Sequence, residues 1–224
     1  MCQVKFSLVG IYGGTFDPIH FGHLRIAEAL LDMVGFSQIY FVPSGMPRLR
    51  NTPVASSYHR LNMVRLAISH HPLFRLDDRE TKRTGESISV NTLGEYRDEF
   101  NADDALCFIM GIDTFMKLPQ WYDWRELFNL CHLILVGRPG YISIMNHENL
   151  SQDLRVECAA RWVSNVDDLK YQSNGLIFTA PTALLDISAT TIRALIHCRK
   201  SVRYLLPEIV FDYIKVNHIY SGKG

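Results

Sequence analysis

The sequence lacks several features that would each place a protein in a special class. No apolar run reaches the roughly 20 residues needed to cross a bilayer, so no membrane-spanning helix and no membrane partner are predicted. Lysine plus arginine and aspartate plus glutamate number 23 each, so there is no excess positive charge to attract nucleic acid. Any anion binding must therefore be local.

Cysteine is sparse and widely spaced, with no CxxC pair. The cysteines are Cys2, Cys107, Cys131, Cys158 and Cys198. An odd, scattered set of this kind predicts reduced thiols in a cytoplasmic protein rather than a disulfide framework. The first residues, MCQVKFSLVGIYGG, carry one lysine and no small-residue cleavage site, so they predict a strand rather than a signal peptide.

What is present is the composition of a globular protein, with 47% hydrophobic and 21% charged residues over 224 positions. Short β-branched runs alternate with segments of helical periodicity. The predicted strands are Val4–Ile11, Ile39–Val42, Phe74–Leu76, Leu106–Met110, His132–Val136 and Leu176–Thr179. The predicted helices are Gly22–Val34, Ser57–Ser69, Ser89–Phe100, Trp124–Leu130, Leu150–Val163, Ala189–His197 and Glu208–Val216, with Pro207 in the first turn of the last.

This alternation predicts a Rossmann-like, doubly wound α/β fold with a mainly parallel sheet and helices on both faces. In such sheets the ligand crevice lies outside the carboxyl ends of the strands. The unusual motifs GGTFDPIH, PSGMPRLR, GID and GRPGY each directly follow an apolar run. They should therefore meet at one edge of the sheet. In the second predicted helix, Leu61, Val64, Ala67 and Ile68 form the expected buried stripe.

The junction GGTFDPIHFGHL places two glycines and two histidines between the first strand and the first helix. Gly13 and Gly14 let a ligand approach the backbone closely. His23 falls in the first helical turn, where free N–H groups and the positive end of the helix dipole favour an anion. His20 lies one step earlier and can reach the same place. The arrangement predicts two imidazoles that converge on negative charge.

Other interpretations of this junction are less well supported. A zinc site needs three or four ligands, and no nearby residues supply the rest at a recognisable spacing. The G-x-G-x-x-G pattern of dehydrogenases and the GK[ST] ending of the P-loop are both absent. Two packed, structural histidines remain an alternative.

The string GGTFDPIHFGHL resembles the first signature of the H-x-G-H nucleotidyltransferases, and the whole chain is similar to bacterial nicotinate mononucleotide adenylyltransferases. FIMGIDTFMKLPQWYDW, HLILVGRPGY and LDISATTIRALI resemble three further family blocks, in order. The resemblance implies one nucleotidyltransferase domain over 1–224, with a helical portion at about 188–220 packed on it. It also implies adenylyl transfer from ATP to nicotinate mononucleotide in NAD biosynthesis, with Mg²⁺ accompanying ATP. Oligomeric state is left open, and a homo-oligomer is compatible with the sequence.

The resemblance also implies roles for individual residues. The catalytic residues are His20 and His23. ATP would further contact Gly13, Gly14, Thr15, Phe16, Arg50, Gly111, Asp113, Ser188, Thr190 and Arg193. The mononucleotide would contact Ser89, Trp121, Tyr122 and Arg138, with Trp121 as the platform for the pyridine ring. No residue is expected to be a dedicated metal ligand.

Several of these residues also have ordinary structural explanations. Asp17, before Pro18, is either a turn residue or close to the metal. The stretch ISATTIR could be a capped helix with a surface arginine. Of the tryptophans and tyrosine in QWYDW, Trp124 is the one expected in the core.

Two positions depart from the family pattern. Leu49 replaces a histidine and cannot donate to phosphate, whereas Arg50 keeps the basic position and Arg48 adds a second charge. Ile88 replaces an aromatic residue beside the substrate site. Two alternatives stay open. One is the same chemistry with nicotinamide mononucleotide, because the sequence does not display the N–H contacts that distinguish a ring carboxylate from an amide. The other is a nucleotide-binding regulator that no longer catalyses, which only the Leu49 departure supports.

Overall fold

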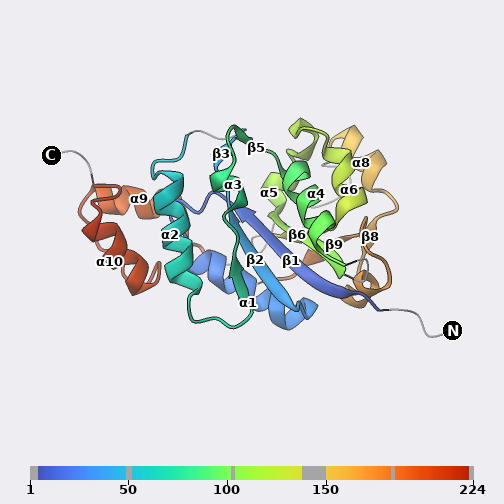
Figure 1. Ribbon diagram of the computed structural model, residues 1–224, viewed down its shortest axis with the longest axis horizontal. Coiled ribbons are helices and arrows are strands. Elements are labelled where there is room, and N and C mark those ends of the chain that lie inside the picture. Colours follow the sequence, from blue (N-terminus) through green and yellow to red (C-terminus); the bar gives the residue numbers. More distant parts are fainter. Residues whose placement is uncertain (1–4, 49–51, 102–103, 138–149, 183–184, 222–224) are drawn as a thin grey trace.

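The computed structural model describes residues 5–48, 52–101, 104–137, 150–182 and 185–221. A seven-stranded sheet forms the centre, with helices packed on both of its faces (Figure 1). The strand order is β4-β2-β1-β6-β7-β9-β8, and the paired strands all run parallel. The predicted Rossmann-like α/β fold is confirmed.

The strands alternate in sequence with the helices. The sheet consists of β1 (Ser7–Gly14), β2 (Gln38–Pro43), β4 (Phe74–Leu76), β6 (Asp104–Gly111), β7 (His132–Val136), β8 (Trp162–Val163) and β9 (Ile177–Ala180). The short strands β3 (Met46–Pro47) and β5 (Glu86–Ser87) pair separately. The longer helices are α1 (Phe21–Val34), α2 (Ser57–Ile68), α4 (Ser89–Glu99), α8 (Gln152–Cys158), α9 (Ala189–His197) and α10 (Glu208–Val216). Single turns are α3 (Arg79–Lys82), α5 (Ile112–Phe115) and α6 (Leu127–Leu130), with 3₁₀ turns η1 (Leu118–Gln120), η2 (Trp124–Glu126) and η4 (Val166–Tyr171).

Alternate residues of each central strand pack into two separate hydrophobic cores, because successive side chains of a strand point to opposite faces of the sheet. In β6, Cys107 and Ile109 pack with α1, α2, α9 and α10, whereas Leu106 and Phe108 pack with α4, α6 and α8. The near-continuous apolar runs of the sequence therefore reflect strands that are covered on both sides.

The first strand begins and ends later than the sequence predicts. It runs from Ser7 to Gly14, so the two glycines belong to the strand itself and pair with Val42 and Pro43 of β2. A Cβ atom at Gly13 would lie 3.1 Å from the ring of Phe108. A side chain at this position would thus press on the Phe108 ring, which would have to shift to make room.

Two predicted helices differ from the structure. The segment 150–163 is helical only over α8, and Trp162–Val163 instead form β8 because the edge of β9 offers backbone hydrogen-bonding partners. The segment 124–130 begins as the 3₁₀ turn η2 and continues as α6. Pro207 lies at the N-cap of α10, one position before the first turn, and α9 and α10 have the predicted bounds.

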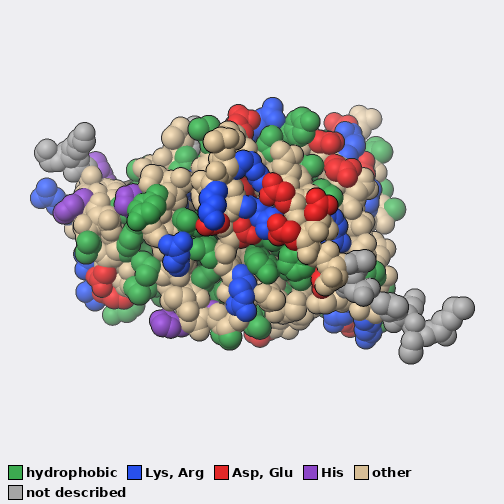
Figure 2. All heavy atoms as spheres, in the orientation of Figure 1, with side chains coloured by type: hydrophobic (Ala, Val, Ile, Leu, Met, Phe, Trp, Pro, Cys, Tyr) green, Lys and Arg blue, Asp and Glu red, His purple; other side chains and the backbone are tan. Residues whose placement is uncertain are grey.

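The surface carries interspersed charges of both signs, as the balanced composition implies. Figure 2 shows acidic and basic side chains mixed over the region of α3 and α4, where Arg79 pairs with Glu95 and Glu99.

In the described part of the chain, no helix is long and apolar enough to span a membrane. Among the described cysteines, Cys107, Cys131 and Cys158 are buried free thiols and Cys198 is an exposed one.

His132 provides a test of the core. Its ring is fully buried: Nε2 donates to the carbonyl of Gln172 at 2.9 Å, and Nδ1 accepts from the N–H of Leu176 at 3.0 Å. Burial lowers the pKa of His132 to about 4. Between pH 6.5 and 4 the unfolded chain protonates His132 and the folded chain does not, so His132 alone should lower the free energy of unfolding by about 3 kcal/mol over this range. Urea unfolding at pH 7, 5.5 and 4.5 measures this fall. In His132→Gln the free energy of unfolding should fall less steeply with falling pH, by the contribution of one proton. An equal pH dependence of the free energy of unfolding in the two proteins would contradict the assignment.

Candidate active site

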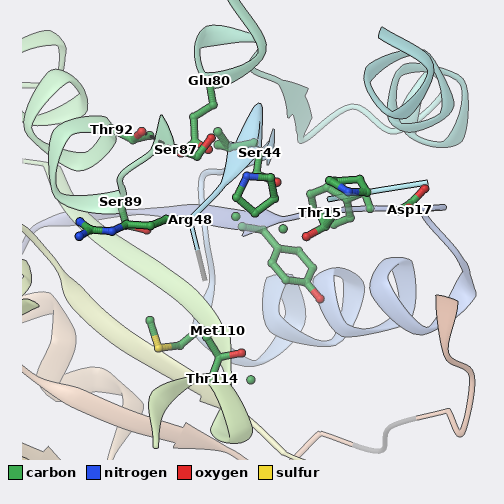
Figure 3. Close-up of a pocket in the computed structure, with 18 of the residues that line it drawn as sticks. Thr15, Asp17, Ser44, Arg48, Glu80, Ser87, Ser89, Thr92, Met110 and Thr114 are labelled. Atoms are coloured by element: carbon green, nitrogen blue, oxygen red, sulfur yellow. Dashed lines mark hydrogen bonds between the residues drawn. The ribbon is translucent and has the colours of Figure 1, made fainter. Parts of the chain in front are cut away.

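A cavity of about 670 Å³ opens at the carboxyl ends of β1 and β6, where the strand order reverses (Figure 3). Its wall includes the N-terminal ends of α1, α4 and α9. The cavity brings together most of the predicted site residues, namely Gly13, Gly14, Thr15, Phe16, His23, Ser89, Gly111, Asp113, Trp121, Tyr122, Thr190 and Arg193. Of the others, Arg50 and Arg138 lie outside the described residues, as does Leu49.

His23 is fixed by the first turn of α1. His20 is the N-cap, and its backbone N–H donates to Nδ1 of His23 at 3.3 Å. With Nδ1 accepting, the neutral imidazole carries its proton on Nε2, so Nε2 is a donor. The ring also packs edge-on against Phe16, with 5.1 Å between ring centroids. Both contacts hold a donor at the cavity wall.

His20 lies behind His23 rather than beside it in the cavity wall. The two rings are stacked with centroids 3.8 Å apart, and His20 is only 6% exposed. Its Nδ1 is buried without a hydrogen-bond partner, and burial lowers its pKa to about 4. An orphaned polar atom of this kind is unusual in a folded protein and is common where a ligand completes the site. Direct contact between His20 and phosphate stays a prediction.

The glycine between the histidines is required by their packing. A Cβ atom at Gly22 would lie 2.9 Å from both Cε1 and Nδ1 of His20, closer than real Cβ contacts. Any larger residue would therefore displace the His20 ring and, through the stack, the ring of His23. The spacing H-x-G-H thus reflects a close contact within the helix start.

The turn after β1 is strained at one residue. Phe16 has φ = 49°, in the left-handed region that side chains other than glycine seldom adopt, and it is only 2% exposed. Its ring packs edge-on against Tyr12 at 5.7 Å between centroids. A Cβ atom at Gly14 would lie 3.0 Å from the Phe16 ring, so the second glycine makes room for that ring.

The start of α9 contributes a fixed positive charge. Arg193 donates through Nη1 to the carbonyl of Asp17 at 2.7 Å and through Nη2 to Thr190 Oγ1 at 3.3 Å. Ser188 is the N-cap, and its hydroxyl accepts from the N–H of Thr191 at 3.1 Å. Ser188 is not among the residues that line the cavity, so its role in ATP binding stays a prediction.

The carboxylate of Asp17 is already engaged by the protein. Its two oxygens accept from the N–H groups of Val54 at 2.8 Å and Ala55 at 3.1 Å, and from the Tyr220 hydroxyl at 2.6 Å. Both oxygens are used by donors, which leaves little capacity for a metal ion. These contacts favour the structural role for Asp17.

Aromatic residues line another part of the cavity. Trp121 is half-buried and packs edge-on against Phe108, with centroids 6.3 Å apart. Tyr122 is 57% exposed and lies under the Arg48 guanidinium, 6.0 Å from its ring centroid. Trp124 is 5% exposed within the core on the α4 side of the sheet, which confirms the prediction that it is the core aromatic.

Gly111 and Asp113 follow β6 directly. Gly111 is the N-cap of α5, and a Cβ atom there would lie 2.5 Å from Oδ1 of Asp113. The exposed Asp113 carboxylate therefore folds back over the glycine at the cavity edge. This position suits an acceptor for the hydroxyl groups of a ribose.

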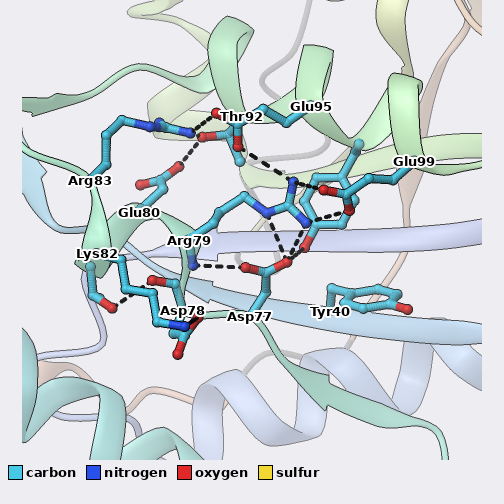
Figure 4. Close-up of polar contacts among 12 residues, drawn as sticks. Tyr40, Asp77, Asp78, Arg79, Glu80, Lys82, Arg83, Thr92, Glu95 and Glu99 are labelled. Carbon is cyan, nitrogen blue, oxygen red and sulfur yellow. Dashed lines mark hydrogen bonds and ion pairs between the residues drawn. The ribbon is translucent and has the colours of Figure 1, made fainter.

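A polar network fixes the helix that carries Ser89. Glu80, 9% exposed, accepts from Thr92 Oγ1 at 2.8 Å, and Arg83 donates to the same hydroxyl at 3.1 Å (Figure 4). Arg79 pairs with Asp77 at 2.7 Å and Glu99 at 2.8 Å. Burial raises the pKa of Glu80. The network holds α4 against the cavity and was not found from the sequence.

Arg60 was also missed, although its position in α2 carries a signal. The buried residues of that helix are Arg60, Met63, Val64 and Ile68, whereas Leu61 and Ala67 of the predicted stripe are only partly buried. Arg60 lies three and four residues before Met63 and Val64, so helical periodicity places it on the buried face. A charged residue at helical spacing from an apolar stripe therefore indicates a buried charge.

The profile of the cytidylyltransferase-like family matches residues 11–195. A probable nicotinate-nucleotide adenylyltransferase of Yersinia pestis (strain Pestoides F) is 40% identical over 216 residues, covering 96% of each chain. The corresponding Pectobacterium atrosepticum protein is 39% identical over 220 residues, covering 96% of this chain and 99% of its own. The chain belongs to the cytidylyltransferase-like family, within its nicotinate-nucleotide adenylyltransferases.

The fold agrees with this membership. The solved structure of Plasmodium falciparum nicotinic acid mononucleotide adenylyltransferase complexed with NaAD superposes with a TM-score of 0.69 at 16% identity, covering 96% of this chain and 97% of the other. At that identity the likeness concerns the fold alone. This nucleotidyltransferase therefore keeps the family fold over nearly its whole length.

Replacing His23 tests whether the cavity wall acts on the reaction. His23→Ala removes a donor held at a helix N-terminus, so we expect kcat to fall on the order of 100-fold or more, with a much smaller change in substrate affinity. Steady-state kinetics measures both. His71→Ala is the matched control, because His71 stacks on Phe74 and pairs with Glu28 outside the cavity lining. Near-normal turnover by His23→Ala would remove this histidine from the mechanism.

Proposed function

We propose that this enzyme transfers the adenylyl group of ATP to the 5′-phosphate of nicotinate mononucleotide, forming deamido-NAD and pyrophosphate in NAD biosynthesis. The observation that carries the proposal is the convergence of the N-terminal ends of α1, α4 and α9 on one cavity. Helix N-termini present free N–H groups and partial positive charge, which suits several anionic groups at once. Both proposed substrates are phosphate esters.

The chemistry needs little from the protein beyond placement. A phosphate monoester has a second pKa of about 6, so the mononucleotide is mostly dianionic at pH 7 and already a nucleophile. Its oxygen attacks the α-phosphorus of ATP, the bond from that phosphorus to the β-phosphate oxygen breaks, and pyrophosphate leaves. No proton must be removed from the attacking group. The site has to align the two esters and stabilise the charge that develops on the leaving group.

The residues divide between the two substrates. For ATP we propose the backbone of residues 13–16 at the end of β1 and in the turn after it, and the two histidines 20 and 23. We also propose Gly111 with Asp113 at the ribose, and residues 188, 190 and 193 at the start of α9 at the phosphates. His23 donates from Nε2 to the reacting phosphates, and Arg193 adds a fixed charge. For the mononucleotide we propose Trp121 as the ring platform, with backbone N–H groups near Ser89 and Tyr122 for the ring carboxylate. Arg50 and Arg138 complete the proposal from outside the described residues.

Mg²⁺ enters this proposal together with ATP. It would be held mainly by phosphate oxygens and water, as is usual for this ion. Asp17 does not fit as a ligand, because both of its oxygens already accept from the protein. We also propose one domain over the whole chain in a cytoplasmic protein; the exposed free thiol of Cys198 is compatible with a reducing compartment.

The start of α4 favours the acid over the amide mononucleotide. Ser89 is the first residue of this eleven-residue helix and lines the cavity. The partial positive charge of a helix N-terminus stabilises a carboxylate more than a neutral amide. This supports nicotinate mononucleotide over nicotinamide mononucleotide as the substrate.

A pyrophosphate-release assay with ATP and a panel of acceptor phosphates tests the function. The panel holds nicotinate mononucleotide, nicotinamide mononucleotide, phosphopantetheine and glycerol phosphate. We expect the highest kcat/KM with the nicotinate compound. Faster use of the amide would overturn the substrate choice, and ATP binding without pyrophosphate release from any acceptor would favour a non-catalytic regulator.

A further inference from the structure

Arg60 joins three separate backbone segments beside the cavity. The residue is fully buried in α2, and each nitrogen of its guanidinium donates to a different carbonyl. Nη1 donates to Thr15 at 2.7 Å, Nη2 to Gly45 at 2.9 Å and Nε to Ala55 at 3.2 Å. Thr15 lies in the turn after β1, Gly45 in the turn after β2, and Ala55 just before α2.

A buried arginine of this kind is costly for a role in stability alone. Burial lowers the pKa of Arg60, which shows that its charge is disfavoured there, and the nearby Asp17 partly offsets this. The two charges are linked through Ala55, whose N–H donates to Asp17 and whose carbonyl accepts from Arg60. Apolar residues often replace buried charges without loss of stability. The three directed bonds therefore point to control of backbone geometry.

The carbonyl of Thr15 belongs to the peptide group that precedes the strained Phe16. A trans peptide directs its N–H opposite to its carbonyl, so the bond from Arg60 directs the Phe16 N–H away from the guanidinium. Phe16 and Thr15 both line the cavity, and Figure 3 shows Thr15 close to Asp17 there. Arg60 thereby sets the orientation of a cavity-wall peptide group next to Phe16, the residue that has an unfavourable φ.

The bond to Gly45 connects the same guanidinium to the neighbouring turn, the one after β2. Ser44, the residue before Gly45, donates its N–H to the carbonyl of Gly14 at 2.9 Å, and it lines the cavity. Arg60 thus fixes the distance between the turns after β1 and β2, because its guanidinium bonds to both. The hydrogen bond from Ser44 to Gly14 joins the same two segments directly.

We propose that Arg60 is a positioning residue for ATP: it holds the end of β1 and the turn that follows it, residues 13–17, in the geometry that receives the triphosphate. The proposal rests on the proposed function, since it assumes that ATP occupies this turn. Tyr220 takes part from the far end of the chain, because its hydroxyl buttresses Asp17 and is itself buried.

Arg60→Met and Arg60→Lys test the proposal. Methionine fills the space without donors, and a lysine ammonium keeps the charge but cannot reach three diverging carbonyls. We expect KM for ATP to rise about tenfold or more in Arg60→Met and less in Arg60→Lys, with KM for the mononucleotide changed less than threefold. A merely structural role would lower the active fraction, and so kcat, with KM for ATP unchanged. That result would overturn the proposal.

Arg97→Met is the matched control. Arg97 also donates to a backbone carbonyl, that of Asp104 at 2.8 Å, but at the amino end of β6, away from the cavity. It should leave KM for ATP unchanged. Arg97 is only partly buried. A rise in KM for ATP equal to that of Arg60→Met would show a general effect of losing an arginine that bonds to backbone, and would overturn the proposal.

Tyr220→Phe keeps the test decisive should the Arg60 variants not fold. It removes the hydroxyl that donates to Asp17 and should raise KM for ATP about threefold. An unchanged KM for ATP would overturn the role of the linked contacts of Tyr220, Asp17 and Arg60 in positioning ATP. Calorimetric binding of a non-hydrolysable ATP analogue is measured in parallel. If the wild-type chain releases no pyrophosphate with any acceptor, the proposed function fails, whereas the analogue affinities still decide the role of Arg60.

Discussion

The reversal of strand order between β1 and β6 is the constraint on which the rest of the structure depends. From β1 the chain passes through α1 and α2 on one face, and it returns to β6 through α4 on the other. Since the two connections leave in opposite directions, no crossover helix of the described residues lies over the carboxyl ends of these two neighbouring strands. The cavity at the carboxyl ends of β1 and β6 follows from this topology; Figure 1 shows the ribbons of α2 and α4 on different sides of the central strands. Without the reversal, a crossover helix would fill that space.

The same topology explains how a chain with no net charge can attract two highly charged substrates. Helices that follow parallel strands begin at the carboxyl edge of the sheet, so their positive ends gather there. Added to these are His23 with a defined donor nitrogen and Arg193 held by a carbonyl at 2.7 Å. Elsewhere, as in the α3–α4 region, basic and acidic side chains are mixed and paired with each other.

Much of the fold followed from the sequence because local signals and tertiary structure agree. The strands at 74–76 and 132–136 and the helices at 189–197 and 208–216 have their predicted bounds, and each has a clear apolar pattern or cap. The sequence pattern predicts helix at 162–163, because the strand character of this segment comes from pairing with β9, a partner fifteen residues away in sequence. Pairing between distant segments leaves no local trace.

For the site, the sequence predicted the residues that carry recognisable chemistry and missed those that hold them. Arg60 and Tyr220 act on backbone groups and on Asp17, from 45 and 203 positions away. A sequence does not show which backbone carbonyl a side chain contacts, so no motif reveals such contacts. The burial of His20 behind His23 was equally hidden, because the stack depends on the absent Cβ of Gly22.

The central claim is that the adenylyl group passes directly from one phosphate to the other, without a covalent bond to His23 or any other side chain. The most direct measurement is the stereochemical course at the α-phosphorus, followed with ATP made chiral at that atom. A single in-line displacement predicts inversion of configuration in the dinucleotide product. Retention would require two displacements through an adenylylated enzyme, and would contradict the account.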